Sequence, residues 1–316
     1  MPQSGERKPV PRKLQLRLGV KTDPVQYRYS YPWLFRFLAE QGVGYVQLGT
    51  FFELYQLPDS WFTQLRAYAH DYGIRIASVF TAHRELGGFF YDSPEFEAVA
   101  RKNFERLIGV GVLVGADCVG CNPGAVLRDQ FHLKERGISR YLAHMKDLMA
   151  YAHARGLRAL TIEPMSCLAE PPTTPDEIRA MAEDLDAYHQ SHCDTVPVGY
   201  CTDIAHGYTD SGGNVVHAHM ELLEATLPWL QELHLKNTDP LFHSTFGFSE
   251  AERCRGIVQV PDVVRLLQEK ADVIPVDTLI GYLEIGGPKL GRDYSDKNLE
   301  SQLRQSLEYV KEAFKC

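Results

Sequence analysis

The chain has 316 residues, of which 44% are hydrophobic and 23% are charged, and its formal net charge is −8. This composition is ordinary for a globular protein, and the length is ample for a full hydrophobic core. The acidic balance argues against nucleic acid as the main partner, because a phosphate backbone needs a basic face. A small anionic substrate remains compatible with it, since that requires only a few local Lys or Arg.

The N-terminal residues, the lengths of the apolar runs and the cysteines indicate where the protein is located. Residues 1–12 are polar and Pro-containing without an apolar core, so we expect a disordered tail and no signal peptide. No apolar run reaches the roughly 18 residues that a membrane helix needs, so we expect no membrane association. The seven cysteines are odd in number and scattered, which disfavours a disulfide framework and favours the cytoplasm.

From residue 13 onward, short apolar segments alternate with amphipathic ones. Runs rich in Val, Ile, Leu, Tyr and Thr that are too short for a helix predict buried strands. We expect eight strands, at residues 15–20, 45–48, 75–80, 118–121, 159–162, 196–202, 231–235 and 279–285.

Each predicted strand is followed by a predicted helix. These helices cover about residues 32–40, 59–72, 93–111, 138–154, 174 onward, 214–227, 261–270 and 297–314. Thr174 is a good N-cap, and Pro175 suits the first helical turn. Gly42, Gly73 and Gly156 lie just past the last apolar residue of their segments, as C-terminal caps do.

Eight strands alternating with eight helices predict a parallel sheet, and the count of eight favours a closed (β/α)8 TIM barrel formed by residues 13–316 as a single catalytic domain. A doubly wound sheet is the alternative. That fold would be expected to have a Gly-rich phosphate-binding loop after the first strand, and residues 20–23 (Val-Lys-Thr-Asp) do not form such a loop. The long segment 237–256 is a candidate lid or substrate-binding loop.

The last four predicted strands each finish on a residue that can hold a metal ion. These residues are Glu163, Asp203, His234 and Glu284. A single carboxylate after a strand is often only a helix cap, but in a parallel barrel the C-terminal strand ends converge on one mouth. Three carboxylates and one imidazole suit one divalent ion, with Mn²⁺ the first choice and Co²⁺, Mg²⁺ or Zn²⁺ the alternatives.

At these motifs the chain resembles the xylose isomerase-like superfamily of sugar isomerases and epimerases, which includes D-tagatose 3-epimerase and inosose dehydratase. The resemblance covers residues 15–314. Its most specific parts are Thr161-Ile162-Glu163-Pro164, Asp203-Ile204-Ala205-His206, His234-Leu235-Lys236 and Leu283-Glu284-Ile285-Gly286-Gly287.

The resemblance implies roles for several residues. It implies that Glu163, Asp203, His234 and Glu284 bind one divalent metal ion, and that His206 contacts a substrate hydroxyl or carbonyl; the alternative for His206 is a structural bond to a loop carbonyl. The ketose epimerases continue from the first metal Glu into an Asn-Arg pair, whereas this chain continues with Pro-Met-Ser. Their free-hexose specificity should therefore not be transferred.

The predicted site can support proton transfer next to a carbonyl. A divalent ion that chelates the carbonyl and a neighbouring hydroxyl of a ketose acidifies the carbon-bound proton and stabilises an enediolate. Two carboxylates on opposite faces can then exchange protons and invert that carbon. By resemblance, Glu163 and Glu284 are the catalytic pair.

Further polar residues are expected near the barrel mouth as substrate-binding groups. His83 and Arg84 follow the third strand, Asn122 follows the fourth, and Lys236 lies two residues beyond the metal His. Lys236 with Arg84 or Arg255 could bind a phosphate or carboxylate. For Arg255 in the long loop, a solvated surface position is the alternative.

The leading prediction is a metal-dependent isomerase or epimerase of a short ketose or ketose phosphate, with a four-carbon erythrulose phosphate as the best single guess by resemblance. The alternative is a dehydratase of the inosose type, a lyase that uses the same metal and enolate. A DNA-repair endonuclease on the same barrel would need more ligands and a basic groove. The expected partner is a small molecule, and a homo-oligomer is compatible with the sequence.

Overall fold

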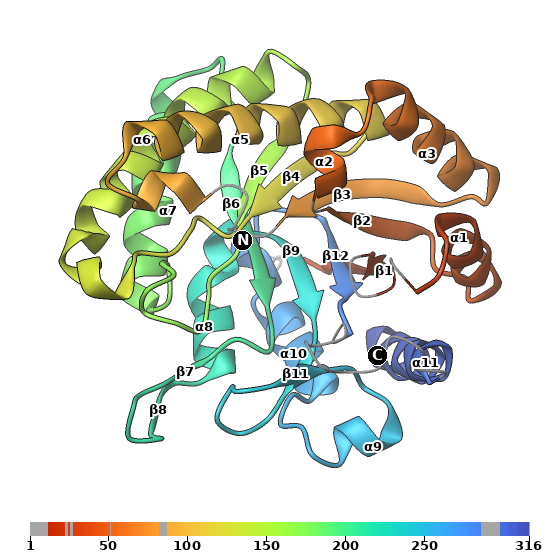
Figure 1. The fold of residues 1–316 in the computed structure, drawn as a ribbon. Coiled ribbons are helices and arrows are strands. Elements are labelled where there is room, and N and C mark those ends of the chain that lie inside the picture. Colours follow the sequence, from red (N-terminus) through yellow and green to blue (C-terminus); the bar gives the residue numbers. More distant parts are fainter. Residues whose placement is uncertain are drawn as a thin grey trace, which may run out of the picture.

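The protein forms a closed barrel of parallel strands wrapped by helices (Figure 1). This computed structural model describes residues 12–22, 25, 28–50, 52–81, 87–285 and 298–315. The strands neighbour one another in the order β1-β12-β9-β6-β5-β4-β3-β2, so the predicted single-domain (β/α)8 barrel is confirmed. The barrel strands are β1 Gln15–Lys21, β2 Tyr45–Thr50, β3 Arg75–Thr81, β4 Cys118–Cys121, β5 Ala159–Ile162, β6 Val198–Asp203, β9 Leu230–Leu235 and β12 Thr278–Leu283.

The helices begin and end where the sequence provides caps. Ser93 caps α5, and Thr174 caps α7 with a proline in its first turn, as predicted. Gly42, Gly73 and Gly156 take left-handed φ values of 65°, 70° and 81° just after their helices. The helices are α1 Tyr31–Glu40, α2 Phe52–Gln56, α3 Asp59–Asp71, α5 Pro94–Val114, α6 Lys134–His153, α7 Pro175–Ser191, α8 His219–Thr226, α9 Glu250–Arg253, α10 Val260–Glu269 and α11 Leu299–Phe314.

Alternation along each strand separates an apolar layer from a polar barrel interior. On β9, Leu233 and Leu235 belong to the hydrophobic core, whereas Glu232 and His234 make hydrogen bonds with other strands across the barrel. Gly120 on β4 is needed there, because a Cβ at this position would lie 2.1 Å from the Thr161 hydroxyl. The interior therefore holds polar side chains in close contact.

The two largest differences from the sequence prediction lie in the C-terminal half of the chain. The helix predicted at 214–227 begins only at His219, because a hairpin of β7 Tyr208–Thr209 and β8 Val215–His217 precedes it. Asp210 makes the turn by accepting from the backbone N–H of Gly212 and Asn214. The predicted long loop 237–256 contains the hairpin of β10 Asn237–Thr238 and β11 Thr245–Phe246, followed by α9.

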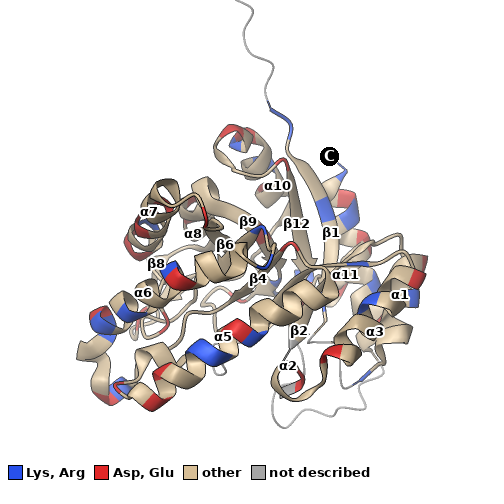
Figure 2. Ribbon diagram, turned by 90° about the horizontal axis from the view of Figure 1, so that it is seen from above, with Lys and Arg blue, Asp and Glu red and all other residues tan. Residues whose placement is uncertain are grey.

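The surface carries both signs of charge, with acidic and basic residues interspersed along α5 and α6 (Figure 2). Residues 1–11 of the predicted N-terminal tail lie outside the described residues. Arg12 is described, and it donates to the carbonyl oxygen of Ile274 at 2.6 Å and pairs with Asp277 at 2.6 Å. No helix within the described ranges combines the length and hydropathy needed to cross a bilayer.

Candidate metal centre

The four predicted ligands converge at the C-terminal ends of four neighbouring strands. Asp203 ends β6 and His234 lies in β9, while Glu163 and Glu284 come directly after β5 and β12. One ligand atom from each residue lies within 4.8 Å of those of the other three. All four groups lie at the mouth where a (β/α)8 barrel places its functional side chains.

Backbone pairing fixes this convergence. Asp203 on β6 stands opposite His234 on β9, and the Glu284 N–H donates to the carbonyl of Leu235 at 3.0 Å. The Ala205 N–H donates to Asp203 Oδ1 at 2.9 Å, which orients the carboxylate. The His234 Nδ1 lies 2.8 Å from Glu163 Oε1 and 3.3 Å from Glu284 Oε2.

Two lysines neutralise part of this negative charge. Lys236 Nζ lies 2.9 Å from Asp203 Oδ2 and 2.9 Å from Glu284 Oε1. Lys21 Nζ, at the end of β1, lies 3.3 Å from the same Glu284 oxygen. Lys21 is buried and the Lys236 side chain is only 13% exposed, so their charges act on the carboxylates with little screening by water.

Two opposing effects set the pKa values of the glutamates in the cluster: burial raises them, and the neighbouring cations lower them. Burial raises the pKa of Glu284, but Lys21, Lys236 and His234 together bring it down to about 2. Burial likewise opposes ionisation of Glu163, yet the charge and hydrogen bond of His234 hold its pKa well below the usual value. Both glutamates are therefore ionised at neutral pH and can serve as ligands.

Two predicted substrate-binding residues lie beside these ligands. Asn122, after β4, donates from its amide nitrogen to Glu163 Oε2 and lies 2.9 Å from the Met165 sulfur. His206 Nδ1 lies 2.7 Å from the carbonyl oxygen of Pro164, and its Nε2 lies 3.4 Å from Asp203 Oδ2. The bond to a loop carbonyl, which was the alternative prediction for His206, is thus present. The other ring nitrogen of His206 faces the cluster.

The cluster fits a divalent metal ion because of its donor atoms and because two of its carboxylate oxygens lack hydrogen-bond donors. Three carboxylates and one imidazole form a mostly oxygen donor set. Asp203 Oδ2 and Glu284 Oε2 are buried and make ion-pair contacts, but neither makes a well-oriented hydrogen bond. Such atoms retain lone pairs that a cation could take.

Three predicted substrate-binding residues remain, and of these the structure describes Arg255 alone. His83 and Arg84 lie outside the described residues. Arg255 is exposed, with its guanidinium carbon 4.0 Å from the centre of the Phe246 ring. The sequence reasoning missed Gln47, whose Oε1 lies 2.7 Å from His234 Nε2. The available signal was a glutamine inside a buried strand, where an unpaired amide is costly.

A parallel eight-stranded barrel with three carboxylates and an imidazole at adjoining strand ends defines a (β/α)8 protein with a candidate metal centre. The chain belongs to the xylose isomerase-like TIM barrel family, whose model matches residues 35–312. No curated protein gives a significant sequence match.

Solved structures share this fold over nearly their whole length. A putative xylose isomerase from Rhodospirillum rubrum is 18% identical, with 94% of this chain and 99% of that chain covered and a TM-score of 0.75. The D-psicose 3-epimerase of Clostridium cellulolyticum, solved with D-tagatose, is 15% identical over 95% and 100%, with a TM-score of 0.69. The probable 3-DHS dehydratase AsbF from Bacillus anthracis is 12% identical over 93% and 98%, with a TM-score of 0.65. At these identities, the likeness supports the fold.

Proposed function

We propose that this protein is a divalent-metal-dependent sugar isomerase or epimerase that acts on a short ketose or ketose phosphate. The observation that carries the proposal is the convergence of Glu163, Asp203, His234 and Glu284 within 4.8 Å at the barrel mouth. When bound, a metal ion would polarise the carbonyl of a ketose and acidify the adjacent C–H. Mn²⁺ is our first choice, with Co²⁺, Mg²⁺ and Zn²⁺ as alternatives.

We assign the other steps of the proposed reaction to residues around the cluster. Glu163 and Glu284 come from strands on opposite sides of β6 and β9, so we assign one to remove a proton and the other to return it. Lys236 and Lys21 would stabilise negative charge that develops on the substrate oxygens. His206 and Asn122 would orient hydroxyl groups.

We propose that the substrate is anionic, and a four-carbon erythrulose phosphate is the best single candidate. It is motivated by the two lysines beside the carboxylates, in a protein with a net charge of −8. Arg84 and Arg255 remain proposed phosphate contacts. We further propose a cytoplasmic protein that takes a small-molecule partner, not nucleic acid or membrane, and that can form a homo-oligomer.

Incubation with a panel of ketoses and ketose phosphates in D₂O, followed by NMR, tests this function. An epimerase or isomerase gives an isomeric product that carries deuterium at the carbon where a solvent-equilibrated base delivered its proton, and a chelator abolishes the reaction. A deoxy or unsaturated product would instead identify a dehydratase of the inosose type. Turnover that persists in metal-free protein would contradict the proposal.

A further inference from the structure

A chain of buried hydrogen bonds runs from His234 across the interior of the barrel to Glu232. His234 Nε2 lies 2.7 Å from Gln47 Oε1, the Gln47 amide nitrogen donates to Ser78 Oγ at 3.2 Å, and Ser78 Oγ donates to Glu232 Oε2 at 3.1 Å. Three strands, β2, β3 and β9, contribute these side chains. Glu232 is 3% exposed, and the other three are fully buried.

With Glu232 ionised, the bonds in this chain run in one direction. Glu232 Oε2 receives the hydroxyls of both Ser78 and Thr161, at 3.1 and 3.3 Å, so this oxygen is an acceptor. Because Ser78 uses its single proton on Glu232, its oxygen must accept from the Gln47 amide nitrogen. Gln47 then presents its oxygen to His234, and an oxygen without hydrogen can only accept. The proton of this bond therefore sits on His234 Nε2.

We propose that Glu232, Ser78 and Gln47 act as one positioning chain that fixes the ring proton of His234 on Nε2 and leaves the Nδ1 lone pair for the metal ion. The inference rests on the proposed metal site. Nδ1 is the ring nitrogen that faces the other ligands, 2.8 Å from Glu163 Oε1 and 3.3 Å from Glu284 Oε2. In the form that binds a metal ion, the Nδ1 proton shared with Glu163 has left and the ring is neutral. A neutral histidine has one proton and one lone pair, so fixing the first directs the second.

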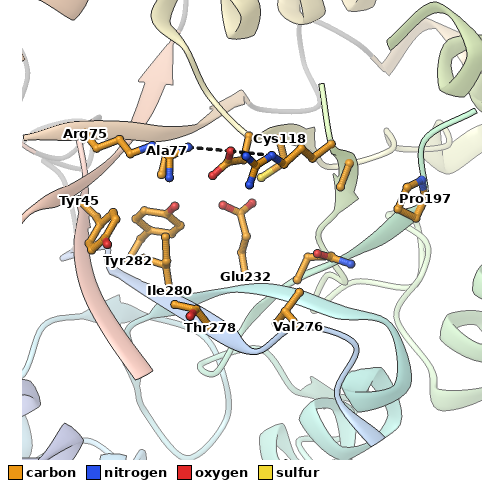
Figure 3. A pocket seen from close by; sticks show the side chains of 14 residues that line it. Tyr45, Arg75, Ala77, Cys118, Pro197, Glu232, Val276, Thr278, Ile280 and Tyr282 are labelled. Carbon is orange, nitrogen blue, oxygen red and sulfur yellow. Dashed lines mark ion pairs between the residues drawn. The ribbon is translucent and has the colours of Figure 1, made fainter. Parts of the chain in front are cut away.

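The position of Glu232 supports a dedicated role. It lines a cavity of about 370 Å³ at the N-terminal end of the barrel, away from the candidate metal centre, and Figure 3 shows its carboxylate pointing toward Cys118. Packing an apolar side chain here would avoid the desolvation of a buried carboxyl group. Direct binding to the metal does not explain this glutamate, whereas the direction of the chain does.

Breaking the chain at its far end should change the tautomer of His234. In Glu232→Met, the Ser78 hydroxyl loses its acceptor and can turn to the Gln47 oxygen, which reverses the amide. The Gln47 NH₂ then faces His234 Nε2, and a neutral ring must carry its proton on Nδ1, where it opposes a cation. We expect Mn²⁺ affinity to fall about 10–100-fold, as for other supports of metal ligands. Ser78→Ala is a smaller second break with the same expected direction.

Glu232→Gln is the matched control, because a glutamine oxygen can still accept from both hydroxyls. We expect its Mn²⁺ affinity to stay within about 3-fold of wild type, a change well below that of losing a support. Calorimetric titration of each metal-free variant gives the affinities, and thermal unfolding checks that each variant is folded. In the Zn²⁺-loaded, ¹⁵N-histidine-labelled protein, NMR should show a slowly exchanging proton on His234 Nε2 in wild type and Glu232→Gln.

The possible outcomes separate the inference from the function on which it rests. Wild-type affinity and an Nε2 proton in both Glu232→Met and Ser78→Ala would overturn the positioning chain while leaving the metal site in place. Equal losses of affinity in Glu232→Met and Glu232→Gln would also overturn it, because only packing would then matter. A wild-type protein that binds no Mn²⁺ would overturn the proposed metal site and the inference together.

Discussion

At the scale of single residues, Glu284 is the carboxylate that contacts three basic side chains of the site. Lys236 and Lys21 contact one of its oxygens, and His234 lies 3.3 Å from the other. Against the opposing effect of burial, these cations bring its pKa down to about 2. Glu284 therefore starts as a carboxylate ready to receive a proton, but as a weak base. The proposed reaction then depends on strong acidification of the substrate C–H.

Glu284→Gln tests the assignment of Glu284 as one of the two bases. We expect kcat for inversion to fall about 10²–10⁴-fold, the usual contribution of a positioned acid or base. Residual deuterium exchange should persist on the one epimer whose proton faces Glu163. NMR of the product measures both, after the metal content of the variant has been matched to wild type. If the metal-loaded variant inverts configuration at nearly the wild-type rate, the second base lies elsewhere, and His206 is the next candidate.

Lys236→Met tests whether the substrate carries an anionic group. Loss of a charge-assisted contact costs about 1.5–3 kcal/mol, so KM for a phosphorylated ketose should rise about 10–100-fold. KM for the corresponding free sugar should change much less. Lys270→Met is the control, since this partly exposed lysine pairs with Glu224 on the surface. Equal increases for the phosphorylated and free sugars would show that Lys236 reads no phosphate.

At the scale of elements, β9 shows which parts of the site could be predicted from sequence. His234 could be assigned because it ends an apolar run, and strand ends meet at one mouth whatever the register. Glu232, two residues earlier, faces the same interior but contacts Ser78 on the opposite side of the barrel. That contact depends on barrel closure and on the stagger of distant strands, which residue patterns in a single strand do not contain.

Tyr200 joins β6 to α7 and provides a test of how these elements are held together. Its buried hydroxyl donates to the carbonyl of Ile178 at 2.5 Å, and burial raises its pKa well above the ordinary value. Tyr200→Phe should cost about 1 kcal/mol at neutral pH. Above pH ~10 the unfolded tyrosine ionises while the folded one stays protonated, so wild type loses about 1.4 kcal/mol per pH unit that the variant does not.

Denaturant unfolding at neutral pH and at several values above pH 10 measures this difference. The stability gap between wild type and Tyr200→Phe should close within about one pH unit above pH 10 and then reverse, so that the variant becomes the more stable protein. Tyr68→Phe, which removes a phenol that is 45% exposed on α3, is the matched control. A gap that stays constant up to pH 12 would show that the Tyr200 hydroxyl ionises equally in the folded and unfolded states.

At the scale of the whole molecule, the barrel could be predicted because strand and helix patterns alternate eight times and their caps mark the boundaries. The hairpin β7–β8 could not, because Val215 and Val216 suit a strand or an amphipathic helix, and only the Asp210 turn decides between them. The two ends of the barrel also differ. The C-terminal mouth gathers the four candidate ligands, while the cavity at the N-terminal end is bordered by the ion pair of Arg75 and Asp117 (Figure 3).

Calorimetric titration of the metal-free protein with Mn²⁺ tests the central claim most directly. We predict one ion per chain in wild type, and no change of affinity in His243→Ala. In His234→Ala we predict a loss of affinity of about 100–1,000-fold, which corresponds to about 2.8–4.2 kcal/mol for one buried ligand. His243 is exposed in the segment after β10, which makes it a matched control for removal of an imidazole. A wild-type protein that binds no divalent ion, or equal affinities in the two histidine variants, would contradict the metal centre proposed at the barrel mouth.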